Sequence, residues 1–106
     1  MAGLLKALRL LGDENRLRLL RLLSREELSV AELQEILAMG QSRISMALSQ
    51  LRQAGLVDLR RAGQKSLYRF TGDATVAGVL TRATEEIAGA REDDEALRLV
   101  LRKRKD

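Results

Sequence analysis

The spacing of the apolar residues changes at Gly55, where a helical pattern gives way to an alternating one. Before this glycine, Ile44, Leu48 and Leu51 recur four and three residues apart, which places them on one face of a helix. After it, residues 56–70 contain two strand-like segments on either side of a Gly-containing turn, the pattern of a β-hairpin. A hairpin alone is only marginally stable in water, so this one must pack against helices.

Two short helices are predicted directly before the hairpin. The first begins at Ser29, because a Ser at the cap with Glu32 three residues later forms a capping box. Residues 38–40 interrupt the helical pattern, and a second helix then runs up to the glycine. Two helices joined by a short turn are a helix-turn-helix. We place this unit at about residues 29–54 and the hairpin at about residues 56–70.

Further helices are predicted on both sides of this middle segment. They cover Gly3–Leu11, Asp13–Leu23 with Asp13 as the N-cap, a segment from Thr71 or Asp73 to Ala90, and Ala96–Lys105. A chain of 106 residues has the length of one small domain, and it has no proline-rich linker. We therefore expect residues 1–106 to form a single, mainly α domain with a small β-hairpin between its fourth and fifth helices.

The residue types that are missing exclude several functions. Without Cys and His, the chain lacks disulfides and the usual thiolate and imidazole ligands of zinc and soft-metal sites. A Cys or Ser nucleophile activated by a His base is excluded as well. No apolar run approaches the roughly 20 residues of a membrane span, and Lys6 and Arg9 interrupt the apolar N-terminus, unlike a signal peptide. We expect a cytoplasmic protein with no cofactor, no metal, no enzymatic activity and no membrane partner.

Positive charge is concentrated in the third of the chain that carries the second helix of the helix-turn-helix and the hairpin. Residues 41–70 contain six basic side chains and one acidic side chain, Asp58. By contrast, residues 1–40 contain six of each kind, and residues 71–106 contain seven basic and eight acidic side chains. A local excess of this kind is typical of a surface that binds a polyanion. Because it coincides with the helix-turn-helix, we predict double-stranded DNA as the partner.

Two sets of DNA contacts are predicted. The second helix presents polar side chains to the major groove, where Gln prefers adenine and Arg prefers guanine. The hairpin presents basic and polar side chains to the phosphate backbone or the minor groove. The helix set is Gln41, Ser42, Arg43, Ser45, Met46 and Ser49, and the hairpin set is Arg60, Arg61, Gln64 and Lys65. The alternative is a helical hairpin with a solvated face, followed by solubilising charges at a sheet edge. The clustering of the two sets favours DNA.

Apolar positions on the terminal helices, at about residues 3–11 and 73–105, indicate a second subunit. The predicted dimer contacts are Leu4, Leu5, Leu8, Val79, Leu80, Leu97 and Leu101. The alternative is that these side chains belong to the core of a single chain. We favour a homodimer, whose twofold axis would set two recognition helices about 34 Å apart on an inverted repeat.

The acidic run Glu92–Glu95 has two interpretations. Its carboxylates could hold a hard cation such as Ca²⁺. The interpretation that we favour is electrostatic: acidic residues at the start of the last helix and the basic run Arg102–Lys105 at its end both complement the helix dipole.

Four segments of the chain resemble the ArsR/SmtB family of bacterial winged-helix repressors. They are LGDENRLRLLRLL (11–23), ELSVAELQEIL (27–37), QSRISMALSQLRQAGLV (41–57) and DLRRAGQKSLYRF (58–70), so the resemblance covers roughly the first 70 residues in register. The resemblance implies a winged helix-turn-helix fold and a homodimer paired through the first and last helices. It also implies a sequence-specific repressor that binds an inverted repeat.

The chain departs from the family pattern at the sensing sites and in the recognition helix. Metal-sensing members carry a Cys-x-Cys motif where this chain has Ser29 and Ala31, and other members use Asp and His on the fifth helix, whereas this chain has no His. The resemblance therefore implies a regulator without the family's metal-sensing or thiol-sensing sites. Met46 and Ala47 replace a frequent Arg-His pair of the recognition helix, and we expect Met46 to meet a thymine methyl group instead.

Two other functions are carried forward as alternatives. Residues 92–106 resemble the linker helix of family members in which this domain precedes an S-adenosylmethionine-dependent methyltransferase. The chain would then be the regulatory N-terminal domain of such a fusion. The second alternative is a winged-helix protein-interaction module that does not read DNA, which the missing Arg-His pair supports. An unidentified effector or a fused C-terminal domain would control a regulator of this kind.

Overall fold

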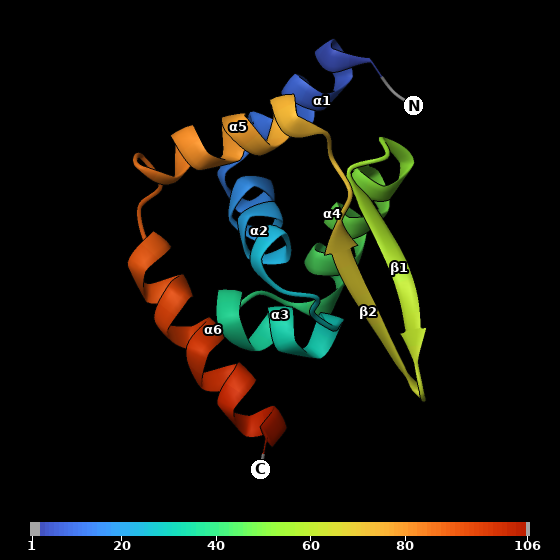
Figure 1. Ribbon diagram of the computed structural model, residues 1–106, viewed down its shortest axis with the longest axis vertical. Helices are drawn as coiled ribbons and strands as arrows, with labels where there is room; N and C mark the ends of the chain where they lie inside the picture. Colours follow the sequence, from blue (N-terminus) through green and yellow to red (C-terminus); the bar gives the residue numbers. More distant parts are fainter. Residues whose placement is uncertain (1–2, 106) are drawn as a thin grey trace.

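The computed structural model describes residues 3–105, which form six helices and one two-stranded antiparallel sheet (Figure 1). In chain order these are α1 (Leu4–Leu11), α2 (Glu14–Arg25), α3 (Val30–Leu37), α4 (Gln41–Gln53), β1 (Val57–Ala62), β2 (Lys65–Phe70), α5 (Ala74–Thr84) and α6 (Ala90–Lys105). This order confirms the expected fold class. The central helix is α2, which packs against α1, α3, α5, α6 and β2. Within residues 3–105, no helix combines the length and the hydropathy that a bilayer-spanning segment needs.

Side-chain caps determine where α2, α3 and α5 begin. Asp13 and Asp73 each accept a hydrogen bond of 3.0 Å from the backbone N–H three residues further on. Ser29 and Glu32 form a reciprocal capping box, in which each side chain accepts a hydrogen bond from the other residue's N–H, at 3.2 and 3.0 Å. Such caps satisfy N–H groups that the first turn of a helix leaves unpaired. The caps predicted at Asp13 and Ser29 are confirmed, and Asp73 is the cap of α5.

The core is built from aliphatic side chains. The largest fully buried ones are Leu19, Leu20, Leu22, Leu28, Leu33, Ile44, Leu48 and Leu51. They come from α2, α3, α4 and the segment before α3, so the helix-turn-helix is anchored on the central helix. The two aromatic residues of the chain, Tyr68 and Phe70, are partly buried and pack against this core from β2. Each buried Leu contributes about 1.5–3 kcal/mol relative to an exposed one.

The hairpin follows the register that its turn imposes. Val57 lies opposite Phe70 at one end, and Ala62 lies opposite Lys65 at the other. Only Gly63 and Gln64 connect the strands, and Gly63 has a φ of +66°, which suits glycine at the first position of a two-residue hairpin loop. Ala62 is the last residue of β1 and lies outside the turn.

A single-residue bridge ties the hairpin to the start of the helix-turn-helix. Leu28 and Tyr68 exchange two backbone hydrogen bonds, of 3.1 and 2.8 Å. Residues 24–28 thus comprise the end of α2 and a short segment that pairs with β2 at Leu28. Because Leu28 immediately precedes the cap of α3, the hairpin and the helix-turn-helix are fixed to each other at this point.

The C-terminal helices differ from the prediction. Helix α5 ends at Thr84 instead of Ala90, and α6 begins at Ala90 instead of Ala96. Gly89, with a φ of +85°, lies in the connection between them. The acidic residues Glu92–Glu95 lie in the first turns of α6, as the electrostatic interpretation expected.

Ion pairs hold the first turns of α6 against α2, and they explain why α6 begins earlier than predicted. Asp93 is buried and accepts two hydrogen bonds of 2.8 Å from Arg18, while Asp94 accepts one from Arg21 at 2.7 Å and one from Arg25 at 2.6 Å. The hydrogen bond from Arg21 lowers the pKa of Asp94 below its usual value. Breaking a buried pair such as Arg18–Asp93 from one side costs about 3–5 kcal/mol. The acidic run therefore fixes α6 against α2. It also lies at the N-terminal end of α6, where the helix dipole favours negative charge.

Candidate nucleic-acid interface

Helix α4 turns one face into the core and the other toward solvent. Ile44, Leu48 and Leu51 are buried, as their spacing predicted. The side chains predicted to contact DNA are all exposed: Gln41, Ser42, Arg43, Ser45, Met46 and Ser49. These side chains, five of them polar and one, Met46, apolar, therefore lie on the solvent-accessible side of the helix.

The start of α4 has the features of an anion-binding helix terminus. The N-cap is Gly40, which has no side chain to occupy the first N–H groups, and the first turn contains no acidic residue. Unpaired N–H groups and the positive end of the helix dipole both attract phosphate. The tight turn before it is closed by Ala38, which adopts a left-handed conformation with a φ of 55°.

The wing, by which we mean residues 57–70, carries the second predicted set. Its exposed members are Arg60, Arg61, Gln64 and Lys65. Arg61 donates a hydrogen bond of 3.2 Å to the hydroxyl of Ser66. Arg60 donates twice to one carboxylate oxygen of Glu27, at 2.9 and 2.6 Å. A phosphate contact by Arg60 would therefore have to compete with Glu27.

A groove of about 400 Å³ lies between α4 and the wing, and its lining includes residues that were not predicted from the sequence. Ser45 and Ser49 were predicted, whereas Arg52, Gln53 and Tyr68 were not. Arg52 is exposed and lies seven residues after Ser45, two helical turns further along the same face. That spacing could have identified it, because the same face carries both predicted serines.

A second groove, of about 190 Å³, separates α4 from the start of α2. Arg43 and Met46 line it together with Asn15 and Arg16 of α2. Arg16 is already engaged, since its side chain donates to the backbone carbonyl of Leu10. Asn15 lies in the first turn of α2, but the carboxylates of Asp13 and Glu14 already occupy this end of the helix dipole, which disfavours a phosphate there.

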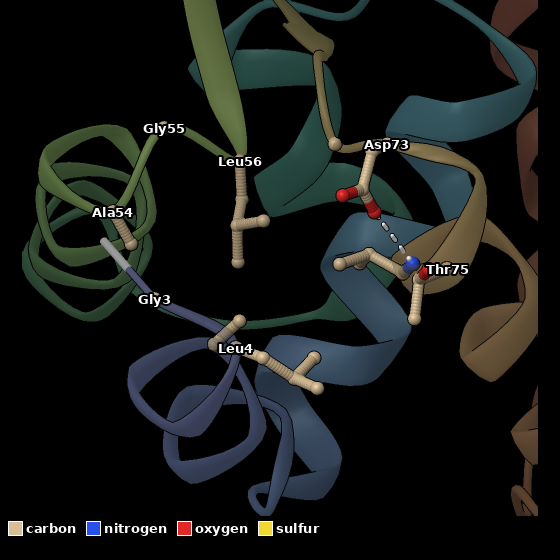
Figure 2. Close-up of a pocket in the computed structure, with 10 residues that line it drawn as sticks. Gly3, Leu4, Ala54, Gly55, Leu56, Asp73 and Thr75 are labelled. Carbon is tan, nitrogen blue, oxygen red and sulfur yellow. Dashed lines mark hydrogen bonds between the residues drawn. The ribbon is translucent and has the colours of Figure 1, made fainter. Parts of the chain in front are cut away.

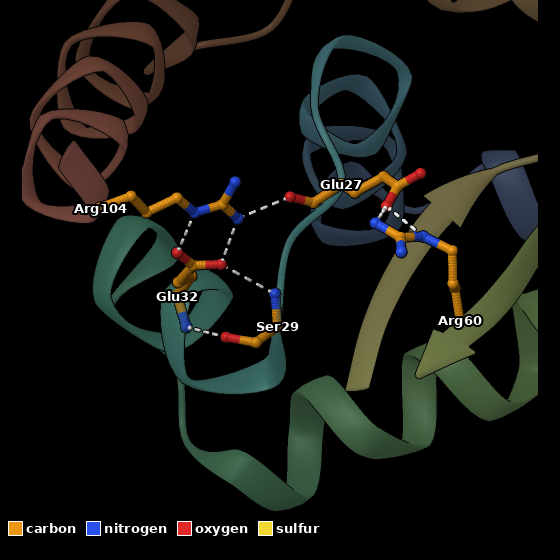
Figure 3. Close-up of polar contacts among 5 residues, drawn as sticks. All are labelled: Glu27, Ser29, Glu32, Arg60 and Arg104. Carbon is orange, nitrogen blue, oxygen red and sulfur yellow. Dashed lines mark hydrogen bonds and ion pairs between the residues drawn. The ribbon is translucent and has the colours of Figure 1, made fainter. Parts of the chain in front are cut away.

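A chain of polar contacts joins α6 to α3 and the wing (Figure 3). Arg104 donates to the Glu32 carboxylate at 2.7 and 2.6 Å and to the backbone carbonyl of Glu27 at 2.7 Å. Glu32 belongs to the capping box of α3, and the side chain of Glu27 binds Arg60. Burial raises the pKa of Glu32, but the hydrogen bonds from Arg104 and Ser29 outweigh it and lower the pKa below its usual value.

The apolar residues of α1 form an exposed face. Leu4, Leu5 and Leu8 are 56%, 63% and 43% exposed in the single chain. Next to them a largely apolar cavity of about 150 Å³ lies where α1 meets the end of α4 and the start of α5 (Figure 2). Its polar wall is Asp73, whose carboxylate accepts the N-cap hydrogen bond of α5.

The other residues predicted at a dimer contact are less accessible. Leu80 and Leu97 are 4% and 5% exposed, so they belong to the core of the single chain. Val79 and Leu101 are half-buried and pack against that core. The alternative interpretation, that these side chains belong to the core, thus describes α5 and α6 better than it describes α1.

Ser29 and Ala31 lie where the family resemblance places the Cys-x-Cys motif of metal-sensing members. The Ser29 hydroxyl accepts the N-cap hydrogen bond of α3, and Ala31 is exposed. Across the part of the chain that the structure describes, no group of three or more His, Cys, Asp or Glu side chains is arranged to hold a metal ion.

Comparison with known proteins identifies similar regulators. The family model described as bacterial regulatory protein, arsR family, matches residues 13–58, from the cap of α2 into β1. The arsenic resistance transcriptional regulator ArsR1 of Pseudomonas putida is 46% identical over 61 residues, which are 57% of this chain and 48% of that protein. The chain spans between 48% and 60% of the length of the curated relatives that it matches.

Solved structures of such regulators share the fold. Reduced HlyU from Vibrio cholerae superposes with a TM-score of 0.70 at 32% identity, covering 76% of this chain and 84% of HlyU. HlyU of that species is named a transcriptional activator. Mb0332 from Mycobacterium bovis, described as a homodimeric winged helix-turn-helix DNA-binding domain, has a TM-score of 0.66 at 27% identity. Its match covers 79% of this chain and 87% of Mb0332.

Proposed function

Because this chain belongs to the ArsR family of bacterial regulatory proteins, we propose that it is a homodimeric, sequence-specific DNA-binding repressor of transcription. It acts in the cytoplasm and has no catalytic role. The observation that carries the proposal is the exposed polar face of α4 beside the basic wing, in a segment with six basic side chains and one acidic side chain.

In this proposal α4 enters the major groove and reads base edges. Gln41 and Arg43 have the side chains that pair bidentately with adenine and guanine, and Met46 adds an apolar contact for a thymine methyl. The N–H groups at the Gly40 end of α4 approach a phosphate. Lys65 and Arg61 of the wing hold the neighbouring backbone, so they supply affinity and salt dependence but little sequence preference.

Repression follows from the geometry of a dimer on DNA. Two recognition helices related by a twofold axis would occupy successive major grooves about 34 Å apart. A dimer in that position excludes other proteins from the same promoter DNA without a further partner. Control of release falls to an effector other than a soft metal or an oxidant of thiols, or to a fused domain, because the chain has neither Cys nor His.

The first experiment is a gel-shift titration of the chain on duplexes from the promoter region of its own gene, at two salt concentrations. We expect a sequence-dependent shift that weakens steeply as salt increases. A promoter reporter in cells then gives the sign of regulation, and we expect lower expression when the protein is present. No shift even at low salt would contradict DNA binding and would favour the protein-interaction module.

Two substitutions separate base reading from backbone contact. Arg43→Ala should relax sequence preference, with a loss of about 1–3 kcal/mol of discrimination at one base pair. Lys65→Ala should weaken binding to all duplexes alike and reduce the salt slope by about one. Arg82→Ala is the control, because Arg82 is an exposed residue of α5 outside both sets. Unchanged preference in Arg43→Ala would show that Arg43 does not read a base.

A further inference from the structure

Arg21, in the middle of α2, is a buried cation that joins three helices. Its side chain is 9% exposed. Its Nε donates to the Thr84 hydroxyl on α5 at 3.1 Å, and its Nη2 donates to Asp94 on α6 at 2.7 Å. Its Nη1 is buried and meets no hydrogen-bond acceptor among residues 3–105. A buried charged donor without a partner is unfavourable, so this nitrogen favours an acceptor that the folded chain does not supply.

Arg21 forms part of the wall of a groove between α2 and α5. The groove has a volume of about 440 Å³, and its lining comprises Arg21, Ser24, Arg25, Ala77, Leu80, Thr81 and Thr84. It is thus polar on one side and apolar at Ala77 and Leu80. The lining hydroxyls of Ser24, Thr81 and Thr84 already donate to backbone carbonyls, so the two arginines supply the donors that remain.

The charges at this groove leave an excess of one positive charge. Arg21 and Arg25 share a single carboxylate, that of Asp94, which receives a hydrogen bond from each. The neighbouring Asp93 is fully engaged by Arg18. One uncompensated guanidinium charge matches a monovalent anion, and charge-assisted hydrogen bonds to a carboxylate are the strong ones.

We propose that the groove binds a small monocarboxylate, with the carboxylate on Arg21 and Arg25 and the apolar body over Ala77 and Leu80. Arg25 is 52% exposed, and its side chain must shift far enough for one ligand oxygen to reach Nη1 of Arg21 while Arg25 donates to the other. The ligand then completes the hydrogen bonding of the residue at which α2, α5 and α6 meet. The site does not depend on the DNA-binding role proposed above.

The direct test is an NMR titration of the ¹⁵N-labelled full chain with sodium butyrate. We expect saturable shifts of the Arg21 side-chain Nε–H and of the Ser24 and Thr81 amides, with a Kd of about 1 mM or below. Parallel titrations use sodium chloride and butyramide, which has the same shape without the charge. Equal shifts with either control, or shifts centred elsewhere, would overturn the site. Equal saturable shifts with inorganic phosphate would overturn the assignment to monocarboxylates.

Substitutions locate the ligand without removing Arg21, whose loss would also undo contacts to Thr84 and Asp94. Ala77→Leu fills the groove from a half-buried position and leaves those contacts intact. It should raise the Kd for butyrate about tenfold or more, at an unchanged Tm. Arg98→Gln removes the same charge as Arg25→Gln from an α6 residue outside this groove. Of these two charge-removing variants, only Arg25→Gln should weaken binding. Wild-type affinity in both Ala77→Leu and Arg25→Gln would refute the proposal.

Discussion

Ala38 determines how α3 ends and how α4 is aimed. Its φ of 55° and ψ of 42° are left-handed, and its N–H donates to the carbonyl of Gln34 at 2.9 Å. For an L-residue with a Cβ this conformation costs about 1–2 kcal/mol, whereas glycine adopts it freely. Glycine is also the residue most often found where a helix ends in this way. The chain therefore accepts strain at the turn that positions α4.

We predict that Ala38→Gly stabilises the protein by about 1 kcal/mol, the relief of strain less the added entropy of the unfolded chain. Urea unfolding monitored by circular dichroism measures the change. Ala31→Gly is the matched control, because Ala31 is an exposed residue inside α3, where glycine costs about 1 kcal/mol. If the two variants are destabilised alike, Ala38 is not strained in solution.

Single residues show which parts of the fold could be predicted. Ser29 and Asp13 carry local signals, because a cap acts within three residues of itself, and both were predicted. The solvent face of α4 followed from the spacing of its buried residues. The sequence indicated a break at residues 38–40 but not the left-handed conformation of Ala38, since alanine is favourable inside helices and only the packing of α3 against α4 requires it.

At the scale of the elements, long-range contacts account for what the sequence missed. The boundary between α5 and α6 depends on pairs such as Arg18–Asp93, whose partners are 75 residues apart. Local propensity does not detect such a pair. The same holds for the Leu28–Tyr68 bridge and for Arg104, which reaches α3 from the end of α6. The hairpin, by contrast, was predicted closely because its turn and alternation are local.

The contact between Glu27 and Arg60 leads to a prediction about the wing. Glu27 neutralises Arg60 in the free protein and would face the phosphate backbone in the complex. An exposed pair of this kind is worth up to about 1 kcal/mol, or about fivefold in Kd. We expect Glu27→Gln to tighten DNA binding up to about fivefold and to steepen the salt slope by roughly 0.9.

Fluorescence anisotropy at several salt concentrations measures both effects of Glu27→Gln. Glu26→Gln provides the control, since it removes the same charge from the adjacent position, and no hydrogen bond from residues 3–105 joins Glu26 to the wing. Identical affinities and slopes for the two variants would mean that Arg60 does not contact DNA.

At the scale of the whole molecule, the exposed apolar face of α1 is the feature that one chain does not explain. Leu4, Leu5 and Leu8 on this short helix are exposed to solvent, whereas the aliphatic side chains of the core are buried. An exposed apolar cluster of this kind is typical of a surface between proteins. The similarity to the homodimeric Mb0332 domain supports a second copy of the chain as the partner. Leu80 and Leu97, which are buried in the single chain, offer little further area.

We therefore predict that Leu5→Glu converts the proposed dimer to a monomer, because it places a charge on the most exposed leucine of α1. Leu99→Glu is the control, since Leu99 is 48% exposed on α6 and lies outside the predicted contact.

Sedimentation equilibrium measures the oligomeric state, and gel shifts compare an inverted repeat with a single half-site. Leu5→Glu should lose affinity for the inverted repeat and keep its affinity for the half-site, because each α4 is intact while the two are no longer linked. A Leu5→Glu protein that stays dimeric would place the interface elsewhere. If Leu99→Glu dissociates as well, the interface includes α6.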